Sequence, residues 1–279
     1  MSMPLVTISI PTFNSAQFLE SCLKAIKNQT YPNIEVNIVD GGSSDETLSI
    51  AKSFGFEQVI RCSDALLEAR YQGIVKAKGD YILLLDSDQI LAKDAIENAV
   101  ELSQKEKKDA IILEEGVYRP SSFIEKLFVE DRKLIHKVKD YSPFTGVLLP
   151  RFYTSTILKK AVNSIKPSIR KAVGGQDHAI IYYEVWQLTQ QVGLVAHAVY
   201  HIEPNSIMKI WKKFYRWGIT SVDARFGMYD ELLQKKERFR TGLFQSGMVK
   251  SSIASIVLLL LKGVPYKTGY LVGKLRKNA

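Results

Sequence analysis

The first part of the chain alternates between two hydrophobic patterns, one typical of buried strands and one typical of amphipathic helices. Short apolar, β-branched runs predict strands at 6–10, 34–39, 57–60, 81–85 and 110–113. Apolar residues at helical spacing predict the helices between them, the last two at 66–76 and 93–104. Strands that alternate with helices in this way are typical of βαβ units, so we expect an α/β fold with a mostly parallel sheet.

Local signals refine this pattern in two places. Ser43 and Glu46 have the spacing of a capping box, which predicts a helix from there to about residue 54. The second half is less regular. Gly174-Gly175-Gln176-Asp177 predicts the start of a helix that reaches about residue 190, and a strand at 194–199 leads to His201. A further helix is expected at 207–226.

Two acidic residues stand where predicted strands end. Asp40 follows one strand, and Asp86-Ser87-Asp88 follows the most hydrophobic strand of the chain. In a parallel sheet the carboxyl ends of the strands form the ligand-binding rim, so these acids are expected to lie near one another. The chain has no phosphate-binding glycine loop. Bound phosphates would therefore need a divalent cation, and the hard oxygens of an Asp-Ser-Asp turn suit Mg²⁺ or Mn²⁺.

Three segments, VTISIPTFN, VNIVDGGSSDET and LEARYQGIVKAKGDYILLLDSD, resemble in order and spacing the opening blocks of glycosyltransferase family 2. The resemblance covers about residues 4–115 and implies a GT-A fold, a Rossmann-like, mostly parallel sheet sandwiched by helices. It implies a catalytic domain at 1–203, with a nucleotide-binding half (1–115) and an acceptor-binding half (116–203). A helical, membrane-associating region at 204–279 would follow.

The same resemblance assigns donor-binding residues. Pro11 and Phe13 of the PTFN block would lie at the nucleobase, where Phe13 either stacks on the base or packs on the first helix. Asp40 would accept a hydrogen bond from the uracil imide, or else only stabilise its own turn. Arg70 would face the diphosphate, unless it is a solvated helix residue. Asp86 would lie near the ribose and the metal.

Metal ligands are implied in the same way. Asp88 matches the direct ligand of Mn²⁺ or Mg²⁺, and Asp86 would assist it. His201 is placed to add a further ligand from a distant strand. A structural role for His201 is the alternative, and His197 is a weaker rival on the same strand.

Asp177 is the candidate catalytic base. Inverting glycosyl transfer displaces a nucleoside diphosphate from the anomeric carbon, and one carboxylate suffices to take the proton of the attacking hydroxyl. The family places such an acid just before a helix, and GGQD fits this pattern. Because Asp is also a favoured N-cap, a purely structural role is the alternative.

The C-terminal part is strongly basic. Residues 202–279 hold 15 Lys and Arg against 5 Asp and Glu, whereas the preceding residues are almost neutral. Together with tryptophans and the apolar run 253–261, this charge fits an anionic membrane surface better than nucleic acid. The run has nine residues, too few to span a bilayer, so we expect a shallow insertion into one leaflet. A helical hairpin packed on the catalytic domain is the alternative.

These features predict an inverting, metal-dependent glycosyltransferase at the cytoplasmic face of a membrane. It would use a nucleotide-sugar donor, a UDP-sugar first of all, and a lipid-linked glycan or polysaccharide precursor as acceptor. Neither a signal peptide nor disulfides are expected from the N-terminal residues and the two cysteines. A polyprenyl-phosphate sugar synthase and a non-catalytic nucleotide-sugar binder are the alternatives. A nucleotidyltransferase would need a Gly-rich basic loop after the first strand, where this chain has PTFNSAQ.

Overall fold

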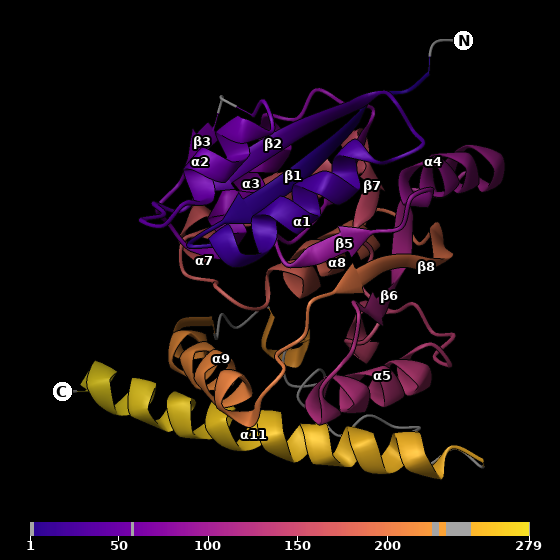
Figure 1. The fold of residues 1–279 in the computed structure, drawn as a ribbon. Helices are drawn as coiled ribbons and strands as arrows, with labels where there is room; N and C mark the ends of the chain where they lie inside the picture. Colours follow the sequence, from indigo (N-terminus) through magenta and orange to yellow (C-terminus); the bar gives the residue numbers. More distant parts are fainter. Residues whose placement is uncertain (1–2, 57–58, 225–228, 233–246, 279) are drawn as a thin grey trace.

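A computed structural model describes residues 3–56, 59–224, 229–232 and 247–278 (Figure 1). Its elements, in chain order, are β1 (Val6–Thr12), α1 (Ala16–Lys27), β2 (Ile34–Asp40), α2 (Thr47–Ser53), β3 (Val59–Arg61), α3 (Leu66–Val75), β4 (Tyr81–Leu84), β5 (Gln89–Leu91), α4 (Ala95–Glu106), β6 (Ala110–Val117), α5 (Phe123–Ile135), η1 (Pro143–Thr145), β7 (Phe152–Thr154), α6 (Ser155–Ser164), α7 (Pro167–Arg170), α8 (Asp177–Trp186), β8 (Val192–His201), α9 (Ile207–Thr220), η2 (Ser221–Ala224) and α11 (Val249–Asn278).

The strands form one sheet in the order β3-β2-β1-β4-β7-β6-β8-β5. The first four strands in this order, β3, β2, β1 and β4, are parallel to one another, and β6 is parallel to β8. The short strand β7 joins these two parallel parts by running antiparallel to both β4 and β6. The predicted α/β fold with a mostly parallel sheet is therefore confirmed, with antiparallel pairing only at β7 and between β5 and β8.

Helices cover both faces of this sheet because alternate strand residues point to opposite sides. On β4, Leu83 joins a core with α1 and α4, whereas Ile82 and Leu84 join a core with α3, α6 and α8. Both cysteines are buried and free, as the composition predicts. The two cores leave the carboxyl ends of the strands open to the site described below.

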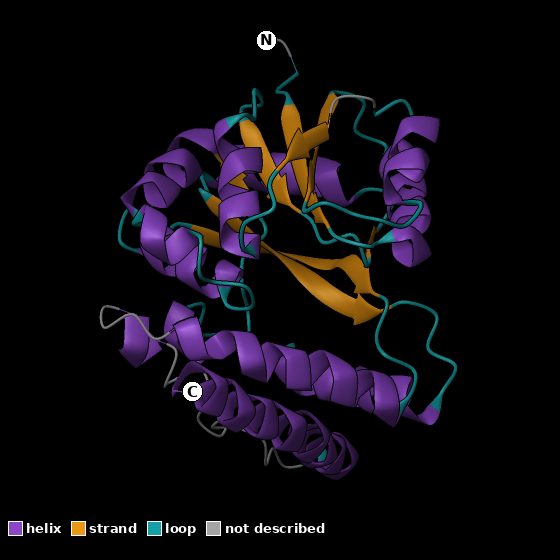
Figure 2. Ribbon diagram, turned by 90° about the vertical axis from the view of Figure 1, so that its left-hand side faces the viewer, coloured by secondary structure: helices purple, strands orange, loops and turns teal. Residues whose placement is uncertain are grey.

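A third hydrophobic cluster lies between α5, α9 and α11 and includes Val117 at the end of β6. Figures 1 and 2 show these helices as a layer below the sheet, with α11 as its outermost member. The backbones of α9 and α11 touch, because a Cβ added at Gly218 would overlap the carbonyl of Tyr266. Hydroxyls also join α11 to α5, where Ser251 donates to Glu130 and Ser255 donates to Asp131.

One local expectation, the capping box, is wrong. Ser43 and Glu46 form no capping box, since the Ser43 hydroxyl donates to Asp40 and α2 begins only at Thr47. A capping box does occur at Ser122 and Glu125, where it starts α5. It lies in the region that the sequence leaves irregular.

The nine-residue apolar run lies within a much longer helix. The apolar run 253–261 is part of the 30-residue helix α11, which continues past Lys262 and through Pro265. Among the residues that the structure describes, this is the one helix long and apolar enough to cross a membrane. The helix packs on α5 and α9 both near its start, at Ala254 and Leu258, and near its end, at Gly269 and Gly273. This packing agrees with the alternative of a helical hairpin packed on the catalytic domain.

Candidate active site

The predicted site residues gather at the carboxyl edge of the sheet. β1 and β2 pair so that Thr12 lies opposite Asp40, and β4, which ends just before Asp86, is the other neighbour of β1. Hydrogen bonds join the loops that follow these strands. The Ser87 hydroxyl donates to the Ser15 hydroxyl, and the backbone N–H of Asn14 donates to the Ser43 hydroxyl. Residues far apart in the sequence are thus held on one rim.

Asp40 is fully buried and stabilises its own turn. One carboxylate oxygen accepts from the hydroxyls of Thr12 and Ser43, and the other accepts from the backbone N–H groups of Gly42 and Ser43. Burial alone would raise the pKa of Asp40, but these donors lower it below its ordinary value. All four acceptor positions of the carboxylate are therefore occupied by the turn.

Phe13 stands at the same rim with 60% of its surface exposed. A Cβ added at Gly41 would contact the edge of the Phe13 ring, and the next residue, Asn14, has a left-handed backbone with φ 49°. Pro11 precedes it inside the buried strand β1. The exposure of Phe13 disagrees with packing on the first helix and leaves an aromatic face open at the strand ends.

Arg70 connects two of the predicted functional acids. It projects from α3 and is 1% exposed, with its Nε on Asp177 and its Nη2 on Asp86. Its Nη1 is buried and has no hydrogen-bond partner among the described residues. Burial would lower the pKa of Arg70, but the two carboxylates outweigh it and raise that pKa. The interpretation of Arg70 as a solvated helix residue is therefore excluded.

Asp177 is the first residue of α8, while Gln176 occupies the N-cap position without a side-chain cap. Burial would raise the pKa of Asp177, but Arg70 outweighs burial and lowers it, so the carboxylate is ionised. Its Oδ2 binds Arg70, and its Oδ1 has no hydrogen bond or ion pair to any residue that the structure describes. Because the side chain is turned to Arg70, it does not act as a helix cap.

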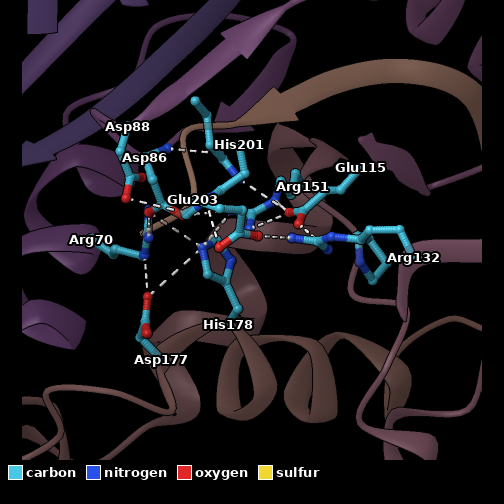
Figure 3. A network of polar contacts seen from close by, with 12 residues as sticks. Arg70, Asp86, Asp88, Glu115, Arg132, Arg151, Asp177, His178, His201 and Glu203 are labelled. Atoms are coloured by element: carbon cyan, nitrogen blue, oxygen red, sulfur yellow. Dashed lines mark hydrogen bonds and ion pairs between the residues drawn. The ribbon is translucent and has the colours of Figure 1, made fainter. Parts of the chain in front are cut away.

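Arg70 and Asp177 begin a chain of alternating charges that runs through the whole site (Figure 3). Each of three arginines bridges two carboxylates: Arg70 binds Asp177 and Asp86, Arg151 binds Asp86 and Glu115, and Arg132 binds Glu115 and Glu203. Arg70 is buried, and the side chains of Arg151 and Arg132 are 12% and 19% exposed. Burial would raise the pKa of Glu115, but the two arginines lower it to about 2. Burial would likewise raise the pKa of Asp86, but Arg70 and Arg151 hold it well below its ordinary value.

The chain of alternating charges continues through His201 to Asp88. The imidazole Nδ1 is 3.4 Å from Glu203 Oε2, and its Nε2 is 3.2 Å from Asp88 Oδ2. Burial would lower the pKa of His201, but Asp88 and Glu203 raise it to about 10. The structure thus brings the predicted pair Asp88 and His201 together. The rival His197 projects outward and pairs with Glu114 instead.

His178 adds a neutral group beside the arginines. Burial, Arg70 and Arg151 all lower the pKa of His178. Its Nε2 lies 2.9 Å from Arg151 Nη1, and because a guanidinium can only donate, this nitrogen is the acceptor. The ring proton is therefore on Nδ1, a buried atom without a hydrogen-bond partner among the described residues.

Sequence reasoning missed several members of this site: Glu115, Arg132, Arg151, His178 and Glu203. The contacts of Arg132 and Arg151 join residues that are 17 to 71 positions apart, so no local spacing marks these contacts. The one usable signal is the capping box at Ser122, which predicts the helix α5 that carries Arg132.

The sheet, its covering helices and the acidic rim define a GT-A type glycosyltransferase fold. The model of the family described as Glycosyl transferase family 2 matches residues 7–162, more than half of the chain. The chain therefore belongs to glycosyl transferase family 2.

The curated relatives match about two fifths of the chain. A glycosyltransferase, GlyG, of Streptococcus pneumoniae is 32% identical over 114 residues, 39% of this chain and 38% of the relative. A chondroitin synthase of Pasteurella multocida is 35% identical over 114 residues, 12% of its own length. The match thus spans about two fifths of the first relative and far less of the second.

Solved structures share the fold over most of the chain. S. aureus TarS 1–349 in complex with UDP-GlcNAc has a TM-score of 0.59 at 15% identity, covering 91% of this chain and 79% of that one. The mannosyltransferase PcManGT from Pyrobaculum calidifontis, in complex with GDP-Man and Mn²⁺, has a TM-score of 0.57 at 18% identity, covering 99% and 87%. At these identities the likeness supports the fold alone.

The arginines that bridge these carboxylates generate a stability prediction. Glu115→Gln leaves Arg132 and Arg151 each short of a carboxylate, so we expect the free energy of unfolding to fall by about 3–5 kcal/mol at pH 6. Because the pKa of Glu115 is lowered to about 2, its contribution is complete above about pH 4.5 and fades as the pH falls toward 2. The difference between wild type and variant in urea unfolding should therefore narrow at pH 3.

The control is Glu101→Gln, which breaks the exposed pair with Lys105 on α4. Exposed pairs contribute about 0–1 kcal/mol, so this variant should unfold almost as wild type does. If Glu115→Gln lowered the free energy of unfolding as little as Glu101→Gln does, the ion pairs of Glu115 would not stabilise the fold.

Proposed function

We propose that the protein is an inverting glycosyltransferase that moves a sugar from a nucleoside diphosphate donor to a hydroxyl of a lipid-linked glycan or polysaccharide precursor. One observation carries the proposal. Asp177 is an ionised carboxylate fixed by buried Arg70, which also binds Asp86 of the Asp-Ser-Asp turn. A base and a donor site are thus connected by a single side chain.

In the proposed reaction Asp177 Oδ1 accepts the proton of the acceptor hydroxyl. The hydroxyl oxygen forms a bond to the anomeric carbon, and the bond from that carbon to the phosphate oxygen breaks. The electron pair of that bond leaves with the nucleoside diphosphate. Arg70 keeps Asp177 oriented and ionised, and the buried position limits competing water.

Phe13 is the proposed platform for the nucleobase, since an exposed aromatic face at the rim can stack on any base. Pro11 would hold the start of this loop in β1. We propose a UDP-sugar as donor because a carboxylate suits the uracil imide N–H. Asp40 would have to exchange one of its turn hydrogen bonds for this contact.

A divalent cation, Mn²⁺ or Mg²⁺, fits the Asp88 end of the site. No group of three or more His, Cys, Asp or Glu among the described residues is arranged to hold a metal. Asp88 nevertheless offers one oxygen, and His201 would offer one nitrogen once the cation displaces the proton that Asp88 and Glu203 favour on its ring. A cation of this type is often held by one or two protein ligands together with substrate phosphates. Asp86 stays a proposed ligand, although Arg70 and Arg151 bind its carboxylate here. When bound, the cation would neutralise charge on the diphosphate.

Nucleotide binding should depend on the metal. We expect UDP to bind in the presence of Mn²⁺ and to bind at least tenfold more weakly in EDTA, because the phosphates lose their main counter-charge. Asp88→Asn should reduce the difference between the two conditions. Titration calorimetry measures both affinities, and equal UDP affinity with Mn²⁺ and with EDTA would refute the metal assignment.

Asp177→Asn should lower turnover by about 10²-fold or more, the usual effect of losing a general base, while UDP affinity changes little. The control is Glu184→Gln on the same helix, whose carboxylate contacts Ser164 and Tyr229 away from the site. Turnover is measured as UDP release. Unchanged turnover in Asp177→Asn would favour a phosphate acceptor, which needs no base. Wild type that binds UDP-sugars without any turnover would favour a binding protein.

We further propose that the protein rests on the anionic, cytoplasmic face of a membrane through α11. This helix exposes a row of apolar residues at spacings of four and seven, which share one face: Val249, Ile253, Leu260, Val264, Leu271 and Leu275. Its opposite side packs on α5 and α9, so the row faces outward along the whole helix. A helix held in this way lies along a surface, and the basic C-terminal region attracts acidic headgroups.

Membrane binding is tested by flotation with phosphatidylserine-containing liposomes. Leu260→Glu should reduce the bound fraction several-fold, because it places a charge in the apolar row. Gln104→Glu adds the same charge at an exposed polar position on α4, away from this row, and should reduce binding much less. Equal binding of both variants and wild type would contradict the role of the row.

A further inference from the structure

Lys213 brings a charge from the C-terminal helices to the polar site described above. It projects from α9, and its Nζ is 4.0 Å from Asp88 Oδ2. The side chain is 27% exposed, and its ammonium also lies 5.3 Å from the centre of the Trp217 ring. A helix whose other contacts are with α5 and α11 thus delivers a cation to the Asp-Ser-Asp turn.

Lys213 differs from the other cations of the site in how firmly it is held. The three arginines each bind two carboxylates at close range, whereas Lys213 has one carboxylate at the longest distance in the chain of alternating charges. Its Nζ makes no hydrogen bond to any residue that the structure describes. A lysine has three donors on a flexible stem, so this ammonium can turn to a new anion without leaving a buried charge unpaired.

We propose that Lys213 binds the diphosphate of the nucleotide-sugar donor. The inference rests on the proposed function, in which the phosphates lie beside Asp88. A group 4.0 Å from that carboxylate is within reach of the same phosphates. When the bond to the sugar breaks, its electron pair stays on the departing diphosphate, and the ammonium stabilises the added charge.

The proposal gives α9 a direct part in donor binding. Residues 204–279 would then supply a donor ligand in addition to a membrane contact. The alternative is that Lys213 only neutralises Asp88, as a local ion pair. The two roles predict different effects of removing the Lys213 charge. A diphosphate ligand would lower the affinity for the nucleoside diphosphate, whereas a counter-ion of Asp88 would raise the affinity for Mn²⁺.

The experiment uses the full chain and three variants. Lys213→Met keeps the length of the stem over Trp217 but removes the charge, and Lys213→Arg keeps the charge. Lys212→Met is the matched control, since Lys212 is the neighbouring residue on α9 and is exposed. Calorimetry measures the affinity of each protein for Mn²⁺ alone and, with Mn²⁺ present, for UDP, GDP, uridine and guanosine. Thermal melting checks that each variant folds.

For the diphosphate that wild type binds, we expect Lys213→Met to lose about tenfold in affinity or more, the usual effect of a lost charged hydrogen bond. Affinity for the matching nucleoside should not change, because it has no phosphates. Lys213→Arg should recover most of the loss, and Lys212→Met should behave as wild type. Turnover by Lys213→Met should fall as well, since the departing charge loses its partner.

Three results would overturn the inference. In the first, Lys213→Met binds the diphosphate as wild type does and binds Mn²⁺ more tightly, so Lys213 is only a counter-ion of Asp88. In the second, it loses diphosphate and nucleoside affinity equally or melts early, so its role is structural. In the third, wild type binds neither UDP nor GDP, and the proposed function fails together with the inference.

Discussion

The buried guanidinium of Arg70 is the interaction on which the site depends. An arginine at 1% exposure is stable only if carboxylates accompany it, because an unpaired buried charge costs several kcal/mol. Asp86 comes from the end of β4 and Asp177 from the start of α8, so this one side chain joins the first strands of the sheet to the later helices. Arg151 and Arg132 repeat the arrangement toward β6, α5 and the end of β8. The site therefore forms only when all these elements are in place.

Sequence alone predicts the part of the site that follows from strand ends. Parallel strands predict that Asp40 and Asp86 lie at the same rim of the sheet. The resemblance to glycosyltransferase family 2 predicts that Asp88 and His201 meet. The arginines of the chain could not be found in this way, since Arg151 and Arg132 meet Glu115 only through the order of β7, β6 and α5. An isolated charge in a sequence does not reveal whether its partner is water or a distant carboxylate.

The differences in the helices have the same origin. Ser43 follows Asp40 closely enough to serve its carboxylate, and this contact takes the hydroxyl that a capping box would use. Lys262 looks like an interruption of the apolar run 253–261, but its ammonium lies 4.4 Å from the centre of the Phe128 ring on α5. A charge that is paired with an aromatic face does not end a helix. Both outcomes depend on tertiary partners that local propensity does not contain.

The polar contacts between α5 and α11 decide what a bilayer could do to this layer of helices. Lipid chains can replace apolar neighbours at little cost, so an interface made only of Val257 and Leu258 could be exchanged for lipid. They cannot replace the hydroxyls of Ser251 and Ser255, which donate to Glu130 and Asp131. Moving α11 into the hydrocarbon would strip both carboxylates of a donor near a medium that offers none. If a bilayer took up only the outer side of α11, the helix would stay attached to α5, and the depth of the polar site below the lipid surface would be set by the protein alone.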